Sequence, residues 1–156
     1  MEGLEIPYAV ILGFSDGANI AMKFAMKYPN KVKALILNGG NLNPKGVKRA
    51  TQIPIEIGYK IARRFASKSA DAKKNAEMLG LMVNEPNIEI NELSKITAPT
   101  LVICGRSDMI KESHTKEIAE NIPNAKLSII KGNHFIANKR YVTFNKEVED
   151  FLQIIH

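Results

Sequence analysis

The sequence contains no tryptophan, one cysteine and three histidines in 156 residues. One cysteine cannot form a disulfide within the chain, and no basic-then-apolar secretory signal opens it, so we expect a reducing, cytoplasmic location. No apolar run approaches the roughly 20 residues that cross a bilayer. We therefore expect no membrane partner, although peripheral binding stays open.

Two further function classes lack support in the sequence. The histidines lie far apart without paired His-x-x-x-His spacing, so neither metal-dependent hydrolysis nor any other cofactor is indicated. The net charge of +6 comes from lysines dispersed among acidic residues, which predicts a solvated surface and no nucleic-acid partner. Cys104 lies within an apolar run and is expected to be a buried, inert thiol.

The length fits one compact domain, and 45% apolar residues supply a core. Nearly continuous apolar runs are typical of parallel strands that helices cover on both faces. Four such runs are present: Tyr8 to Phe14, Ala34 to Asn38, Thr100 to Gly105 and Lys126 to Ile130. They predict an α/β fold with a parallel sheet of about four strands.

Helical spacing of apolar residues separates these runs. A first helix follows Gly17 and stops at Tyr28-Pro29, a second spans Ser113 to Asn121, and a third carries the closing stripe of Phe144, Val148, Phe151, Leu152 and Ile155. We expect right-handed crossovers to place helices on alternating faces of the sheet. Residues 41–98 are too many for a single crossover helix, so they predict an inserted helical cap. We expect the first part of this cap to be broken by Pro44, Gly46, Pro54 and Gly58. A helix is expected from Ser69 to Leu81, which is rich in strong helix formers.

The segment Gly13-Phe14-Ser15-Asp16-Gly17 lies directly between the first strand and the first helix. This strand-turn-helix context is typical of a nucleophile elbow, in which both glycines avoid crowding around a strained turn. The alternative interpretation is that Ser15 or Asp16 merely caps the helix.

A nucleophilic serine needs a base and a group that orients the base. His134 follows the fourth strand, at the same carboxyl edge as Ser15, whereas His114 is expected at a helix surface and His156 at a frayed end. Of the four aspartates, Asp16 adjoins the nucleophile, Asp71 lies in the cap and Asp150 lies on the final helix, which leaves Asp108, after the third strand, as the candidate. Solvated-loop and turn roles for His134 and Asp108 remain the alternatives.

Together these motifs, with Ala98-Pro99-Thr100 before Gly105-Arg106-Ser107-Asp108 and with Gly132-Asn133-His134, resemble the α/β-hydrolase superfamily. The resemblance implies a Ser15, Asp108 and His134 triad, with the Asp16 N–H in the oxyanion hole. It also implies an esterase-like activity, in a family that includes small esterases, lipid hydrolases and carbon-carbon bond hydrolases.

In that superfamily four further strands and a second oxyanion donor precede the elbow, so we expect a partial fold with an exposed first strand. Homodimerisation through that strand, or a missing partner chain, would cover it. The resulting hypothesis is a serine hydrolase of ester-like substrates, and the alternative is a weak or inactive remnant that serves as a binding module. Phe65, Met78, Leu81 and Met82 are expected to pack within the cap or to line an acyl site.

Overall fold

A parallel sheet of four strands forms the centre of the computed structural model, which describes residues 1, 3 and 5–155. The strand order is β1-β2-β3-β4, with β1 at one edge. The strands are β1 Ala9–Phe14, β2 Val32–Asn38, β3 Thr100–Gly105 and β4 Ala125–Ile130. The predicted α/β fold class is confirmed, and each apolar run is a strand.

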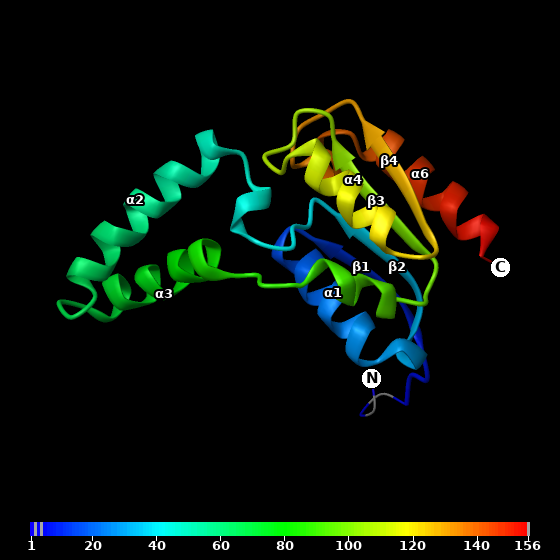
Figure 1. Cartoon of the computed structure of the whole chain (residues 1–156), viewed down its shortest axis with the longest axis horizontal. Helices are drawn as coiled ribbons and strands as arrows, with labels where there is room; N and C mark the ends of the chain where they lie inside the picture. Colours follow the sequence, from blue (N-terminus) through cyan, green and yellow to red (C-terminus); the bar gives the residue numbers. More distant parts are fainter. Residues whose placement is uncertain (2, 4, 156) are drawn as a thin grey trace.

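Helices cover both faces of this sheet (Figure 1). The longer ones beside it are α1 Asp16–Lys27, α4 Glu112–Asn121 and α6 Tyr141–Ile154, and α5 Ile136–Lys139 is a single turn. Short 3-10 turns complete the connections: η2 Pro29–Lys31, η3 Pro44–Gly46 and η4 Ile90–Lys95. Helix α1 ends one residue before Tyr28-Pro29, as predicted.

The helices do not alternate between the faces, so that expectation was wrong. The connections between successive strands, α1, η4 and α4, all pack in one core cluster with Leu35, Leu37 and Val102. The opposite face buries Ile36, Ile103 and their neighbours against α5 and α6. The reason is topological, because strands added in sequence order in one direction place every right-handed crossover on the same side.

The segment between β2 and β3 contains two helices that pack on each other, α2 Arg49–Phe65 and α3 Ala70–Asn84. They form a hairpin that projects away from the sheet (Figure 1). Ser69 caps α3 by accepting a hydrogen bond from the Ala72 N–H at 3.1 Å. The expectation that Pro54 and Gly58 break this region was wrong, since α2 runs through both. Proline removes one backbone donor, and the contacts with α3 keep the helix intact.

The ends of the same segment belong to the core of the sheet domain. Leu42 lies in the core cluster at one end, and Ile88, Leu93, Ile96 and Ala98 lie in it at the other. Of the described residues between β2 and β3, only the α2–α3 hairpin therefore stands out from the sheet domain, and these core contacts fix both of its connections to the domain.

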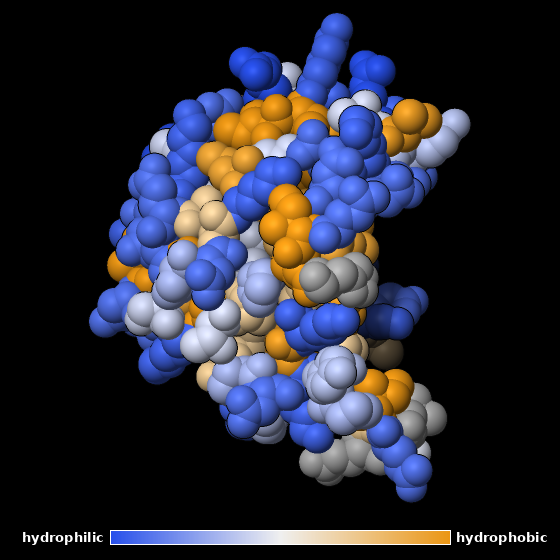
Figure 2. Space-filling model, turned by 90° about the vertical axis from the view of Figure 1, so that its right-hand side faces the viewer, coloured by the Kyte–Doolittle hydropathy of each residue, from blue (hydrophilic) through white to orange (hydrophobic). Residues whose placement is uncertain are grey.

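Apolar side chains also remain at the surface. Figure 2 shows hydrophobic patches among hydrophilic residues on one side of the molecule. Along the edge strand β1 and Tyr8 just before it, every second side chain is exposed, from Tyr8 at 55% through Val10 and Leu12 to Phe14 at 38%. Within the described residues no strand pairs with the outer side of β1. The predicted exposed first strand is therefore present.

Candidate active site

Three polar side chains meet at the carboxyl edge of the sheet. Ser15 follows β1, Asp108 follows β3 and His134 follows β4. The His134 Nε2 lies 3.0 Å from the Ser15 Oγ, and its Nδ1 lies 2.8 Å from the Asp108 Oδ1. A carboxylate only accepts hydrogen bonds, so Nδ1 carries the proton and Nε2 accepts from the serine hydroxyl. The structure brings together all three side chains that the sequence singled out.

The backbone at Ser15 has the strained conformation of an elbow. Its φ is 54° and its ψ is −122°, and its N–H donates to the Asn38 carbonyl at 2.8 Å. The serine occupies the N-cap position of α1, but its side chain makes no capping hydrogen bond. The hydroxyl is therefore directed to His134, which argues against the simple capping interpretation.

The two flanking glycines differ. A Cβ on Gly13 would lie 2.4 Å from the Gly17 carbonyl oxygen, so only glycine fits there. A Cβ on Gly17 would meet nothing described within 4 Å. The expectation of crowding was right for Gly13 and wrong for Gly17, because a side chain at Gly17, in the first turn of α1, would have open space around it within the described residues.

Asp108 is held from two directions. Its Oδ1 accepts from the Ile110 N–H at 3.0 Å as well as from His134, and the residue is buried. Its Oδ2 has no hydrogen-bond partner among the described residues. Asp108 thus stabilises its own turn, which was the alternative interpretation, and also contacts His134. It does not cap α4, because the N-cap of that helix is Lys111.

His134 is buried between aromatic rings and a glycine. Its ring centroid lies 4.9 Å from that of Phe14 and 5.6 Å from that of Phe135. A Cβ on Gly39, whose φ is +65°, would lie 2.8 Å from the His134 Cε1. The imidazole therefore occupies space that glycine at position 39 leaves free, which fixes one side of the ring.

Sequence reasoning missed the contribution of the turn after β2. Asn38 pairs with Phe14 and Ile103 on the neighbouring strands, is fully buried, and has no side-chain hydrogen bond among the described residues. Gly39 follows it directly. The Gly39-Gly40 pair at the end of an apolar run was the available signal, because paired glycines at the carboxyl edge of a strand indicate close packing.

The model of the "Serine hydrolase (FSH1)" family matches residues 4–145. The chain belongs to this serine hydrolase family. It is 26% identical over 171 residues to the human "Serine hydrolase BPHL", and the match covers 98% of the chain and 57% of that relative. A "2-hydroxy-6-oxononadienedioate/2-hydroxy-6-oxononatrienedioate hydrolase" of Cupriavidus pinatubonensis is 26% identical over 186 residues, covering 97% of the chain and 64% of that protein.

Solved structures share the fold of this chain. A meta-cleavage product hydrolase from Pseudomonas fluorescens superposes with a TM-score of 0.74 at 21% identity, covering 100% of the chain and 68% of that structure. This likeness confirms the α/β-hydrolase fold. The chain spans little more than half of the length of the human relative.

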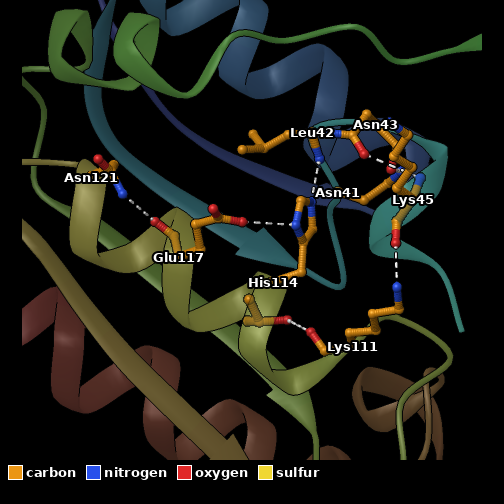
Figure 3. A network of polar contacts seen from close by, with 9 residues as sticks. Asn41, Leu42, Asn43, Lys45, Lys111, His114, Glu117 and Asn121 are labelled. Atoms are coloured by element: carbon orange, nitrogen blue, oxygen red, sulfur yellow. Dashed lines mark hydrogen bonds and ion pairs between the residues drawn. The ribbon is translucent and has the colours of Figure 1, made fainter.

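His114 lies between α4 and the first residues after β2 (Figure 3) and is buried, so the predicted surface position was wrong. Its Nε2 accepts from the Leu42 N–H at 3.0 Å, and its Nδ1 lies 3.1 Å from the Glu117 Oε2. A Cβ on Gly46 would lie 2.3 Å from the imidazole Cδ2. Burial lowers the pKa of His114, although the Glu117 carboxylate opposes that shift. His114 thus joins α4 to the first residues after β2.

The other candidate residues, Cys104, Asp71 and Asp150, lie in three separate elements. Cys104 is buried in β3, and burial raises the pKa of its thiol to about 11, as expected for an inert cysteine. Asp71 lies in the first turn of α3, and Asp150 pairs with Lys146 on α6. His156 lies outside the described residues. In the described part of the chain, no three His, Cys, Asp or Glu residues form a cluster that could hold a metal ion.

The four apolar cap side chains differ in exposure. Packing within the cap was the expected role; it was wrong for Met78 and Leu81, which are 55% and 64% exposed, whereas Phe65 and Met82 bury more than half of their surface. The α2–α3 contact uses other residues, since the Tyr59 ring lies against Gly80 and Leu79 lies against Gly58. Tight interhelical packing occurs where one helix presents a glycine, so the longer apolar side chains are left on the outside.

Proposed function

We propose that the chain is a serine hydrolase of ester-like substrates, with Ser15 as nucleophile, His134 as general base and Asp108 as the group that orients the base. One observation carries the proposal: His134 is hydrogen-bonded on both ring nitrogens, to the serine hydroxyl and to a buried carboxylate. This pairing supports transfer of the serine proton to a base of fixed tautomer.

The reaction proceeds in two steps. The Ser15 Oγ attacks the substrate carbonyl while His134 Nε2 takes the hydroxyl proton, and the imidazolium then gives this proton to the departing alkoxide. Water attacks the acyl-Ser15 ester in the second step, with His134 again accepting the proton and returning it to Ser15. Asp108 accepts a hydrogen bond from Nδ1–H throughout and stabilises the imidazolium.

The backbone N–H of Asp16 is the oxyanion donor in this proposal. It belongs to the first turn of α1, where helix N–H groups have no intrahelical acceptor and the helix dipole favours negative charge. One such donor contributes on the order of 10²- to 10³-fold to turnover. In this proposal the Asp16 N–H donates to the substrate carbonyl oxygen, which becomes negatively charged when Ser15 attacks.

The surroundings of His134 favour substrates with an apolar part. Phe14 and Phe135 lie beside the imidazole, with ring centroids 6.0 Å apart, and both retain exposed surface. Aromatic faces beside a nucleophile bind alkyl or aryl groups through apolar contact. Short aryl esters are therefore the substrates of choice for a first assay.

The deciding experiment compares the chain with its Ser15→Ala variant on para-nitrophenyl acetate and butyrate. We expect the variant to lose at least roughly 10³-fold in turnover while its circular dichroism is unchanged. Full turnover in Ser15→Ala would overturn the proposal. A fluorophosphonate probe separates it from the inactive-remnant alternative, because labelling of Ser15 requires an activated nucleophile, and folded protein without labelling favours the remnant.

We also propose that two copies associate through β1. An unpaired edge strand with exposed Val10 and Leu12 is a template for pairing with a second strand. Antiparallel pairing of two β1 strands about a two-fold axis satisfies the backbone groups of both. A separate partner chain that supplies the neighbouring strand is the competing occupant.

A further inference from the structure

Helix α2 carries an apolar stripe whose four side chains are about half exposed. Ile53, Ile57, Ile61 and Phe65 repeat at intervals of four residues, which places them along one side of the helix. Their exposed fractions are 41%, 53%, 55% and 44%. Four large apolar side chains in a row on an exposed helix indicate a binding surface.

The three isoleucines of the stripe lie on a different side of α2 from the residues that contact α3, whereas Phe65, seven residues after Gly58, lies nearer the contact side. Gly58 and Tyr59 contact α3, with a Gly58 Cβ position 3.6 Å from Leu79 and a Gly80 Cβ position 3.0 Å from the Tyr59 ring. Because the hairpin uses these positions, the isoleucines are not needed to hold α2 on α3. The hairpin projects from the sheet domain, so an extended surface can approach it (Figure 1).

Basic residues are concentrated on the same hairpin, so the expectation that the lysines are dispersed among acidic residues was wrong for this segment. Residues 48–84 contain eight Lys or Arg and three Asp or Glu, a net charge of +5 out of +6 for the whole chain. The basic residues are Lys48, Arg49, Lys60, Arg63, Arg64, Lys68, Lys73 and Lys74. The Lys68 Nζ lies 4.8 Å from the centroid of the Phe65 ring, next to the end of the stripe. The partner of this surface must therefore accept apolar side chains and carry negative charge.

We infer that α2, with its apolar stripe and flanking cations, docks the protein on the surface of an anionic lipid membrane. A helix of 17 residues is about 25 Å long and can lie along the interface, with Ile and Phe between the acyl chains and Lys and Arg at the headgroups. In the described residues no helix is long and apolar enough to span a bilayer. The attachment is thus peripheral and reversible, and it depends on charge.

Charge favours an anionic membrane over a second copy of the chain as the partner of this surface. A copy would bring a second hairpin of net charge +5 against the first, and like charges oppose that contact. Anionic headgroups instead neutralise the cations, and each basic residue near such a surface adds to the attraction.

The test is sedimentation of the full chain with phosphatidylcholine vesicles, with and without phosphatidylserine. We expect binding only with phosphatidylserine and release at high salt. Ile57→Gln/Ile61→Gln and Arg63→Gln/Arg64→Gln should each weaken partitioning by roughly tenfold or more. The matched control is Ile20→Gln, which removes an exposed isoleucine from α1 and should bind as the parent does.

A fluorescence measurement keeps the proposal testable if a double variant fails to fold. The sequence has no tryptophan, so Ile61→Trp gives a single reporter on the stripe, and Ile20→Trp gives one on α1. Anionic vesicles should shift the emission of the first to the blue and leave the second unchanged. Equal emission of both, equal binding to neutral vesicles, or an oligomer that Ile57→Gln/Ile61→Gln dissociates would overturn the proposal. Ser15→Ala should bind vesicles as the parent does, so failure of the proposed hydrolysis is distinguishable from failure of docking.

Discussion

The imidazole of His134 packs against Gly39 so closely that a Cβ at position 39 would lie 2.9 Å from the ring Nδ1. The same Nδ1 donates to Asp108. The turn after β2 therefore helps to position the imidazole for the hydrogen bond that orients the proposed base, although Gly39 contributes no side chain. Because glycine has no reactive side chain, a search of the sequence for catalytic groups does not identify Gly39.

Gly39→Ala is expected to lower turnover of para-nitrophenyl esters by roughly 10²-fold, since a displacement of about 1 Å in a catalytic group has an effect of that size. The positive φ adds backbone strain for alanine. The matched control is Gly58→Ala in α2, where the new Cβ meets Leu79 at an ordinary 3.6 Å. Similar turnover in the two folded variants would show that Gly39 does not position the ring.

Gly13→Ala and Gly17→Ala should change stability in opposite directions. The first places a Cβ 2.4 Å from a carbonyl oxygen and is expected to lower the free energy of unfolding by about 2 to 3 kcal/mol. The second meets nothing described within 4 Å and replaces glycine within α1, which should raise it by up to about 1 kcal/mol. Urea unfolding of the two variants and the parent measures both effects, and equal destabilisation would contradict the difference in crowding.

His114 should make the stability depend on pH. Burial holds its pKa below the ordinary value of 6.5, so the unfolded chain binds a proton more readily than the folded one. Stability is then complete above about pH 6.5 and falls as the pH drops below it. Protonation of Nε2 would also remove the acceptor of the Leu42 N–H.

The measurement is urea unfolding of the parent and of His114→Gln at pH 7.5 and at pH 5.5. The variant cannot titrate at this position, so its loss of stability on acidification should be smaller than that of the parent. Other titrating groups contribute equally to both proteins and cancel in the comparison. Identical losses would mean that His114 titrates alike in the folded and unfolded states.

Association through β1 predicts a dimer that a charge on the strand disrupts. Leu12→Lys should give a monomer in light scattering at micromolar concentration, because lysine on an edge strand opposes pairing. Ile20→Lys introduces the same charge at another exposed apolar position and should leave the dimer intact. A monodisperse monomer of the parent protein at that concentration would refute the dimer.

Local sequence patterns were sufficient to predict the four strands, the helix that follows Ser15, and the three residues of the proposed triad. Each apolar run is long enough to form a strand, and parallel strands bring their carboxyl ends to one edge. Ser15, Asp108 and His134 directly follow three of these strands, so their convergence could be predicted from spacing alone.

Only the tertiary structure decided what lies around those side chains. His114 has the local pattern of a surface helix residue, yet Gly46 and Leu42, from a distant segment, bury it. Gly13 and Gly17 belong to one motif, and only their surroundings separate the crowded glycine from the free one. The stripe on α2 would be a core pattern in another fold, but here α3 packs against a different side of the helix. Periodicity specifies which face of an element is apolar, whereas its burial depends on which distant segments pack against it.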